Sequence, residues 1–433
     1  MKANKLYKKA KKVILNGNML LSKRPEMYLP EYWPTYFSKA KGINVWDLNG
    51  RKYIDMVCAV GQSILGYANS KVDKEVNRFI KKGNMTTLNC PEEVELAEKL
   101  LSLHPWAGMV KFARSGGEAN AIAVRISRAA SKKDHVAICG YHGWHDWYLS
   151  VNLSSKKNLN DHLLPGLNPS GVPKALRGTV HPFKYNDYEA LEKLVKKYEI
   201  GTIKMEVARS SLPNKKFLLK VRKLAKKNKI VLIFDECTTG FRRNNGGIHL
   251  LENVYPDMAM FGKALGNGYA ITAIIGKKKI MKAAEDSFIS STFWTERTGY
   301  IAALKTLKEM DKTKSWKFII KAGAYFNKKL ANLSRKYGLK IDINGIEAIS
   351  SFNFKSKNNL IYKTFISQEM LKKGYLASNI IFFTICHTKK IIDKYINDLD
   401  ECFNKIAKFD SKRRQKKLLK GSVCHSKFKR LND

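Results

Sequence analysis

The sequence lacks any hydrophobic run that approaches the roughly 20 residues a helix needs to span a bilayer. Its first residues also lack the apolar core of a signal peptide and form a basic, mildly amphipathic stretch instead. We therefore expect a cytoplasmic protein that does not associate with a membrane.

Cysteine pairs with CxxC spacing are missing as well. The seven cysteines are odd in number and widely spread along the chain. This distribution argues against a disulfide framework and against a zinc knuckle. We expect reduced thiols, several of them in the core.

Arginine is scarce, although the formal net charge is +43. Only 16 of the 80 basic residues are arginine, and the lysines are scattered along the whole chain. Arginine reads phosphates and bases in a bidentate manner, so its scarcity argues against nucleic-acid binding. We interpret the charge as a compositional bias, except in the basic tail at 411–433, which is a candidate mobile arm.

What the chain does contain is enough apolar material for a large enzyme. It has 433 residues, of which 44% are hydrophobic and 11% aromatic, and it shows no internal repeat. From about residue 109, short apolar runs alternate with amphipathic segments, which predicts an α/β fold with a mostly parallel sheet covered on both faces. The expected strands and helices are 109–113, 117–131, 135–139, 178–182, 187–199, 201–206, 215–228, 230–234, 258–261 and 271–275.

This pattern divides the chain into a large sheet domain and a smaller α+β domain built from both chain ends. We expect an N-terminal arm and part of the small domain at 1–65, the large domain at 66–305, and the C-terminal small domain at 306–410. The basic tail at 411–433 completes the division. A long polar loop at 150–178 interrupts the large domain, and such loops are often functional.

One aspartate and one lysine each follow an expected strand of the large domain. The run Ile230–Phe234 indicates a buried parallel strand, and Asp235 follows at its carboxyl end, where open α/β sheets bind ligands. Lys263 follows 28 residues later, in the Gly-rich segment 261–268. These two residue types suit a pyridoxal-phosphate (PLP) enzyme, which requires a lysine amine that condenses with the cofactor aldehyde and a buried carboxylate that keeps the pyridine nitrogen protonated. The alternative is a structural aspartate and a surface lysine.

A Ser-Gly-Gly turn follows the first expected strand of the large domain and opens a helix. At Ser115, Gly116 and Gly117 the backbone amides can approach an anion closely, and the helix N-terminus adds its partial positive charge. This arrangement suits a cofactor phosphate, although a Ser-Gly-Gly turn by itself is more often only a tight turn.

Aromatic and histidine residues follow the expected strand 135–139. A ring such as Tyr141 at the carboxyl end of a strand can lie flat on a cofactor ring. His142 and His145 are three residues apart and are candidate metal ligands. No clear third ligand stands nearby, so we expect no metal site. The hydroxyl-rich segment 290–299 precedes a helix and is also typical of N-capping.

Together these motifs resemble those of class III aminotransferases of fold type I, and most closely the glutamate-1-semialdehyde aminomutase-like branch. The resemblance covers roughly residues 30–405 and implies a PLP-dependent transferase fold with a seven-stranded type of sheet. The motifs that carry it, in the order and spacing of the family, are Arg114–Asn120, Tyr141–Gly143, Phe234–Arg242, Phe261–Gly268 and Ser291–Phe293.

The resemblance implies a role for the main motif residues. Lys263 would form the Schiff base with PLP, and Asp235 would pair with the pyridine nitrogen. The Tyr141 ring would stack on the cofactor, while the amides of Gly116 and Gly117 would hold its phosphate.

The resemblance also implies the rest of the cofactor site. Thr292 would reach the phosphate from the neighbouring subunit, which implies a homodimer with shared active sites. Glu206 matches the family's acidic residue beside the active site. Ser115, His142 and Thr238 complete the expected set.

The sequence departs from the family at several positions. Gly117 replaces the usual Ser or Thr of the phosphate turn, and Thr238 stands where many class III transaminases have a glutamine near the cofactor hydroxyl. Val60 takes the place of the aromatic residue that aminomutases carry near the substrate. No arginine lies between Arg335 and Arg413, so the C-terminal arginine that clamps a substrate carboxylate in some members is missing. We therefore do not expect glutamate semialdehyde itself as the substrate.

We predict an aminotransferase that moves an amino group between an amino acid and an aldehyde or keto acceptor. The alternative is an intramolecular aminomutase acting on glutamate-1-semialdehyde or a similar amino-aldehyde, which needs no separate donor. A third hypothesis, a nucleic-acid-binding protein on a degenerate enzyme scaffold, predicts a lost lysine or carboxylate, whereas Lys263 and Asp235 are both present. The choice of acceptor depends on loops 24–37, 57–63 and 150–178.

Overall fold

The structure, a computed structural model, describes residues 2–162, 165–208, 212, 214–411 and 418–428. The chain divides into two compact units. The large unit is Ser70–Trp316, and the small unit combines Met1–Asn69 with Lys317–Asp433. Within the described residues, no helix has the length and apolar character needed to cross a membrane.

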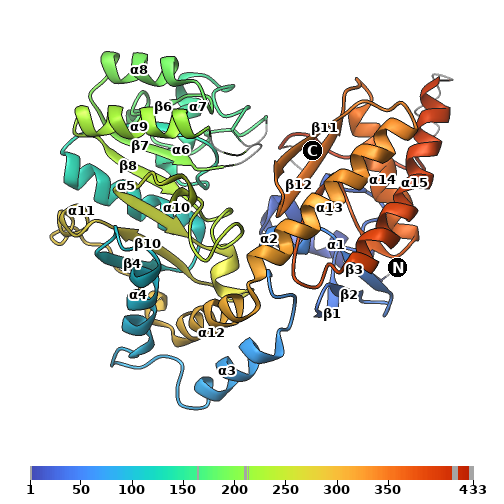
Figure 1. Ribbon diagram of the computed structural model, residues 1–433, viewed down its shortest axis with the longest axis horizontal. Coiled ribbons are helices and arrows are strands. Elements are labelled where there is room, and N and C mark those ends of the chain that lie inside the picture. The colour runs from blue at the N-terminus through green and yellow to red at the C-terminus, as the bar shows by residue number, and fades with distance from the viewer. Residues whose placement is uncertain (1, 163–164, 209–211, 213, 412–417, 429–433) are drawn as a thin grey trace. The chain divides into compact units, whose positions relative to one another are not determined.

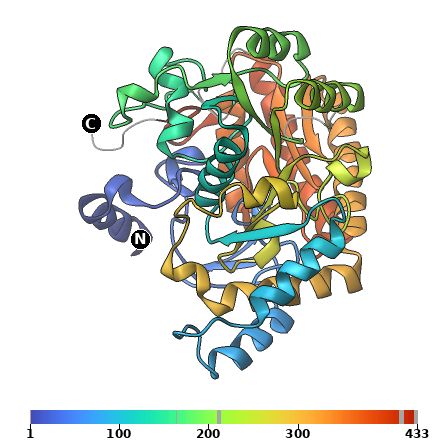
Figure 2. The same cartoon turned by 90° about the vertical axis from the view of Figure 1, so that its left-hand side faces the viewer.

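The large unit is built on a seven-stranded sheet with the strand order β4-β10-β9-β8-β7-β5-β6 (Figure 1). The neighbours from β9 to β6 are parallel, whereas β10 runs antiparallel to both β9 and β4. The expected mostly parallel sheet is therefore confirmed, with one reversed strand next to the edge strand β4 (cyan arrow in Figure 2). The strands are β4 (Met109–Ala113), β5 (His135–Cys139), β6 (Val180–Pro182), β7 (Ile200–Glu206), β8 (Val231–Asp235), β9 (Met258–Phe261) and β10 (Thr272–Gly276).

Helix α5 (Gly116–Ser131) covers one face of this sheet. Its buried side chains Ala119, Ile122, Ala123 and Ile126 follow the spacing of one apolar helix face. Strand β8 shows no polar alternation because both of its faces are covered. The strand side chains that pack in one core with α5 are Val231, Ile233, Met258, Met260 and Ile274.

The remaining helices of the large unit flank the strands or connect them. The α-helices are α3 (Ser70–Ile80), α4 (Glu92–Leu103), α6 (Asp146–Leu149), α7 (Val151–Ser154), α8 (Tyr188–Lys197), α9 (Lys215–Lys227), α10 (His249–Glu252), α11 (Lys278–Lys282) and α12 (Arg297–Thr313). The 3-10 helices are η4 (Lys174–Leu176), η5 (Lys263–Gly266) and η6 (Thr292–Thr295).

The small unit is an α+β structure that draws on both ends of the chain. One sheet has the order β1-β2-β3-β13, in which β13 (Tyr375–Leu376) pairs parallel to β3 (Lys52–Asp55). A second sheet has the order β11-β12-β14. The other elements are α1 (Lys2–Val13), η1 (Leu15–Gly17), η2 (Leu21–Lys23), η3 (Pro25–Met27), β1 (Phe37–Lys41), β2 (Asn44–Asp47), α2 (Cys58–Gly61), β11 (Ile341–Ile346), β12 (Ile349–Phe354), α14 (Asn359–Lys372), β14 (Ile380–Phe382) and α15 (Lys389–Ser411), with α13 (Ser315–Lys336) at the boundary.

The described part of the basic tail, 418–428, is held against the small unit. Leu418 and Cys424 are buried. The backbone amide of Cys424 donates to Thr364 Oγ1 at 3.0 Å, and that of Lys420 donates to Gln368 Oε1 at 2.8 Å. The hypothesis of a mobile arm therefore does not describe 418–428, while the rest of the tail beyond Ser411 lies outside the described residues.

Candidate active site

Six strands of the large unit, β4 to β9, run in the same direction, so their carboxyl ends meet at one edge of the sheet. This edge is where open α/β sheets bind ligands. The expected site residues that stand at or just after these strand ends are Ser115, Gly116 and Gly117 after β4, Tyr141 and His142 after β5, Glu206 on β7, Asp235 and Thr238 at β8, and Lys263 after β9.

Lys263 begins the 3-10 turn that follows β9. Its φ of +39° lies in the left-handed region, which non-glycine residues seldom occupy and which is found most often at functional sites. Its Nζ donates a hydrogen bond to Thr238 Oγ1 at 2.8 Å. The buried Arg242 in turn donates from Nε to the Thr238 carbonyl at 2.7 Å, which holds Thr238 in place for the lysine.

Asp235 is the last residue of β8 and is only 4% exposed. The Cys237 amide donates to Oδ1 at 3.1 Å, and His142 Nδ1 lies 2.9 Å from Oδ2. Lys204 Nζ is 3.9 Å from the same Oδ2. Burial alone would raise the pKa of Asp235, but the Lys204 charge and the His142 hydrogen bond hold that pKa well below its usual range.

His142 is completely buried and orients the carboxylate. An ionised carboxylate only accepts hydrogen bonds, so Nδ1 of His142 is the donor to Asp235. The other ring nitrogen lies 3.2 Å from the Cys139 carbonyl. Burial lowers the pKa of His142, so the neutral ring is favoured. Its partners identify it as a support for Asp235.

Tyr141 and Glu206 are joined through the backbone. The Tyr141 amide donates to Glu206 Oε2 at 3.0 Å, and the half-exposed Tyr141 ring packs edge-to-face against Tyr148. Gly140, between β5 and Tyr141, has a φ of +109°. A Cβ at Gly140 would lie 2.5 Å from Glu206 Oε2, so only glycine permits this approach.

The Ser-Gly-Gly turn forms the N-terminus of α5. Ser115 caps the helix, because its side chain accepts from the Glu118 amide and its own amide donates to Glu118 Oε2 at 2.7 Å. The amides of Gly116 and Gly117 belong to the first turn, where an α-helix offers no internal acceptor. A Cβ at Gly116 would meet nothing within 4 Å.

His145 explains why position 117 is glycine. A Cβ at Gly117 would lie 2.7 Å from Cε1 and 3.0 Å from Nδ1 of the His145 ring. The Trp144 ring stacks on His145 with 4.4 Å between centroids and is itself 68% exposed. The imidazole of His145 thus occupies the space that a side chain at position 117 would fill.

Thr292 is exposed at the start of η6. The following backbone is tied to the residue before the Ser-Gly-Gly turn, since Arg114 donates from Nε to the Phe293 carbonyl and from Nη2 to the Trp294 carbonyl, both at 2.9 Å. The expected contact of Thr292 with a phosphate of the neighbouring subunit stays a prediction.

Sequence reasoning missed Lys204, Arg242 and the packing of His145 on Gly117. Lys204 carried a signal, because a lysine inside the apolar strand Ile200–Glu206 contradicts a strand buried on both faces. Arg242 carried no signal beyond its place in a recognised motif. The fit of His145 against Gly117 joins residues 28 positions apart and had no sequence signature.

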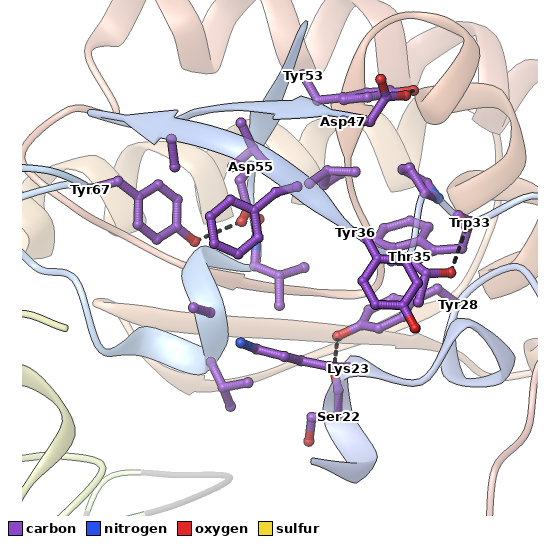
Figure 3. Close-up of a pocket in the computed structure, with 18 of the residues that line it drawn as sticks. Ser22, Lys23, Tyr28, Trp33, Thr35, Tyr36, Asp47, Tyr53, Asp55 and Tyr67 are labelled. Carbon is purple, nitrogen blue, oxygen red and sulfur yellow. Dashed lines mark hydrogen bonds between the residues drawn. The ribbon is translucent and has the colours of Figure 1, made fainter. Parts of the chain in front are cut away.

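The small unit contains a cavity of about 400 Å³ (Figure 3). Two of the loops expected to determine the acceptor, 24–37 and 57–63, contribute to its wall. At one side Tyr67 donates to the Asp55 carboxylate at 2.7 Å (Figure 3). The aromatic residues of the wall are Tyr28, Trp33, Tyr36, Phe37, Tyr53 and Tyr67, and the charged ones are Lys23, Asp47 and Asp55.

Proteins of known family, sequence or structure resemble this chain over most of its length. The family model described as aminotransferase class-III matches residues 29–403. The chain is 31% identical over 368 residues to the 3-aminobutyryl-CoA aminotransferase of Cloacimonas acidaminovorans (strain Evry), which covers 83% of this chain and 84% of that protein. It is 31% identical over 428 residues to the glutamate-1-semialdehyde 2,1-aminomutase of Wigglesworthia glossinidia brevipalpis, with coverage of 92% and 97%. The PLP internal aldimine form of the FumI protein from Sphingopyxis sp. MTA144 superimposes with a TM-score of 0.85 at 23% identity, over 96% of this chain and 99% of that chain.

Proposed function

We propose a function for this chain, which belongs to the class-III aminotransferase family. In this proposal Lys263 binds the PLP aldehyde and Asp235 faces the pyridine nitrogen. Family membership follows from the match over 29–403 and from a relative 31% identical across 92% of the chain. The family expected from the motifs is confirmed, and the protein is a PLP-dependent enzyme.

The proposal is carried by the pairing of β8 with β9. In their register Asp235 lies beside Met260, and Lys263 stands three residues further along the neighbouring strand's path. A buried aspartate and a lysine therefore stand at or just after the ends of neighbouring strands, at the same edge of the sheet. This is the pair that PLP chemistry requires.

The phosphate end of the site also suits PLP. The N-terminus of the long helix α5 offers first-turn amides to an anion. Among the described residues, Nδ1 of His145 is buried without a hydrogen-bond partner, and a phosphate oxygen would satisfy it. We infer that Ser115, Gly116, Gly117 and His145 hold the phosphate, with the Tyr141 ring and Glu206 beside the cofactor ring.

When bound, PLP supplies an electron sink at the substrate Cα and carries the amino group from one substrate to the next. The chain supplies the proton transfers and the orientation. Nζ of Lys263 acts as the general base at the substrate Cα, and Thr238 Oγ1, 2.8 Å from Nζ, directs the amine. Asp235 keeps a negative charge against the pyridine nitrogen because His142 donates to it.

We favour transfer between two substrates over rearrangement within one. Relatives of 31% identity carry both kinds of name, an aminotransferase and an aminomutase, so both remain compatible with the family. Val60 lines the cavity of the small unit where the aminomutase branch is expected to carry an aromatic residue. The small-molecule partners are then an amino acid donor and an aldehyde or keto acceptor.

A homodimer with shared active sites is the proposed assembly. Its support is the exposure of Thr292 and of two large aromatic side chains close to the phosphate turn, Trp144 and Phe293, each 68% exposed. Sedimentation equilibrium tests the assembly directly. A mixture of Lys263→Ala and Thr292→Val chains, dissociated and reassembled, would regain one complete site per hybrid dimer if the sites are shared. The cytoplasmic location stays a prediction.

The test of function is the visible spectrum of the purified protein with PLP. We expect a yellow band that one amino donor bleaches and one carbonyl acceptor restores. Lys263→Ala should lower turnover by more than about 100-fold, the lower end of what general acid–base groups contribute. Lys278→Ala, an exposed lysine of the same unit, is the matched control.

The outcome separates the two reactions. Turnover that requires a separate donor supports the aminotransferase, whereas turnover of a single amino-aldehyde without a donor supports the aminomutase. A Lys263→Ala protein that transaminates normally would contradict the assignment of the lysine.

A further inference from the structure

Lys204 is a buried lysine inside the core of the large unit. Among the lysines that the structure describes, it is the only one that is completely buried, at 0% exposure. It stands on β7, whose residues are all buried. Burial of a cation is unfavourable unless a partner compensates its charge. The partner therefore indicates what Lys204 does.

The side chain of Lys204 reaches across the neighbouring strand β8. In register, Lys204 lies beside Ile233, and Met260 of β9 lies beside Asp235. Nζ donates to Met260 Sδ at 3.0 Å and lies 3.9 Å from Asp235 Oδ2. A thioether is a weak acceptor, so the carboxylate is the main stabilising partner of the ammonium.

Three other titratable groups face this pair. His142 donates to Asp235, and Cys237 and Glu206 lie near enough to act on the Lys204 charge. Burial lowers the pKa of Lys204, while Asp235, Cys237 and Glu206 act in the opposite direction. Asp235 and Lys204 thus form a buried ion pair before any ligand is considered.

We propose that Lys204 is a positioning residue that shares the Asp235 carboxylate with the pyridine nitrogen of PLP and so limits how fully that nitrogen holds its proton. The inference rests on the proposed function, in which Asp235 faces that nitrogen. One carboxylate then serves two cations, the ammonium and the protonated ring, inside a buried region where like charges repel strongly. A ring that is only partly protonated withdraws fewer electrons from the substrate Cα.

The test is the ¹⁵N NMR shift of PLP labelled at the pyridine nitrogen and bound to the full-length protein. In the wild type we expect a shift between those of the neutral and the fully protonated ring. In Lys204→Met we expect the shift to move to the protonated value. The ratio of protonated to neutral ring should rise at least about tenfold, which corresponds to one pKa unit.

Two further variants separate charge from packing. Met260→Leu removes the thioether acceptor but keeps the ammonium, so it should leave the ¹⁵N shift at the wild-type value. Lys204→Gln keeps a polar side chain without the charge and should behave as Lys204→Met, which also serves if the methionine variant does not fold.

The outcomes are distinct. A fully protonated ring in the wild type, or an unchanged shift in both Lys204 variants, overturns the role of Lys204 and leaves it a packing residue. Failure of the proposed function looks different, because a wild-type protein that takes up no PLP at Lys263 shows no yellow band at all.

Discussion

Two buried aspartates, one in each unit, close a strand in the same way but face different partners. Asp55 ends β3 of the small unit and Asp235 ends β8 of the large unit, at 7% and 4% exposure. Among the described residues, the hydrogen-bond donors to Asp55 are neutral: the amides of Val57 and Cys58 at 2.8 and 2.9 Å and the Tyr67 hydroxyl. The charge of Lys23 acts on Asp55 less than these hydrogen bonds do. The Asp235 carboxylate, in contrast, lies close to the charged amine of Lys204 and accepts a hydrogen bond from the ring of His142.

The difference shows that the partner, and not burial, decides the charge of a buried carboxyl. Burial raises the pKa of Asp55, and its hydrogen bonds offset that only in part. At Asp235, Lys204 and His142 outweigh the same burial and keep the pKa below its usual range. Asp235 therefore keeps its negative charge despite burial, whereas Asp55 mainly holds the backbone amides that follow it.

The backbone that Asp55 holds is a strained turn beside the cavity of the small unit. The four consecutive residues Cys58–Gly61 all have φ between +46° and +83°. For a β-branched residue such as Val60, at +61°, this is a rare conformation. The amide of Cys58, its first residue, and the amide of Val57 just before it both donate to the Asp55 carboxylate, which stabilises the entry to the turn.

The largest expected effect comes from removing one charge. Asp235→Asn leaves the buried Lys204 ammonium uncompensated and should lower the free energy of unfolding of the cofactor-free protein by about 3–5 kcal/mol. It should also slow turnover severely while some PLP still binds. Asp55→Asn keeps an acceptor for both amides and should change the free energy of unfolding by less than about 1 kcal/mol. Urea unfolding measures both, and equal losses would contradict the comparison.

The second-largest effect tests whether the broken pair of Asp235 and Lys204 causes the loss of stability in Asp235→Asn. In the double variant Asp235→Asn with Lys204→Met, no unpaired charge remains. We expect it to recover about 1–3 kcal/mol relative to the sum of the two single losses, as for residues in direct contact. Asp55→Asn combined with Lys204→Met is the control pair and should be additive within about 0.5 kcal/mol.

The pH dependence of stability should have opposite sign for the two aspartates. The folded pKa of Asp235 is lowered, so its stabilisation is present above the unfolded value of about 4 and is lost as the pH falls further. The folded pKa of Asp55 is raised, so its contribution is present below about pH 4 and is lost as the pH rises through the folded pKa.

Thermal unfolding midpoints of the cofactor-free protein measure this contrast. Relative to the wild type, Asp55→Asn should gain stability between about pH 4 and pH 7, where the ordinary aspartate pKa has been passed. Asp235→Asn should differ most from the wild type at neutral pH, and the difference should shrink in acid. Parallel curves for the three proteins would refute the assignment of the two pKa directions.

The smallest expected effect comes from relieving the backbone strain at Val60, in the turn that follows Asp55. Val60→Gly removes a side chain from a left-handed residue and should raise the free energy of unfolding by about 1 kcal/mol, since such a conformation costs roughly 1–2 kcal/mol per residue. Val57→Gly is the matched control, because Val57 has an ordinary φ of −90° and is buried. It should destabilise instead. A loss of stability in both variants would mean that packing outweighs strain at Val60.

Local patterns predicted most of the sheet and the two central residues. The apolar run 230–234 before Asp235 predicted a short strand buried on both faces, and that strand is β8, Val231–Asp235. Parallel strands end at a common edge, and Asp235 and the Gly-rich segment of Lys263 both stand at that edge. The departure at Gly117 was visible in the sequence, but its reason, the ring of His145, was not.

The sequence by itself determined which strands would form and which residue types would stand at their ends, because apolar runs and glycine turns are local properties. Tertiary structure alone decided the charge of Asp235. Lys204 and His142 reach that carboxylate from different strands or loops, and their distances to it depend on how β5, β7 and β8 are ordered in the sheet. Electrostatic energies vary with distance and burial, and neither is written in a local pattern.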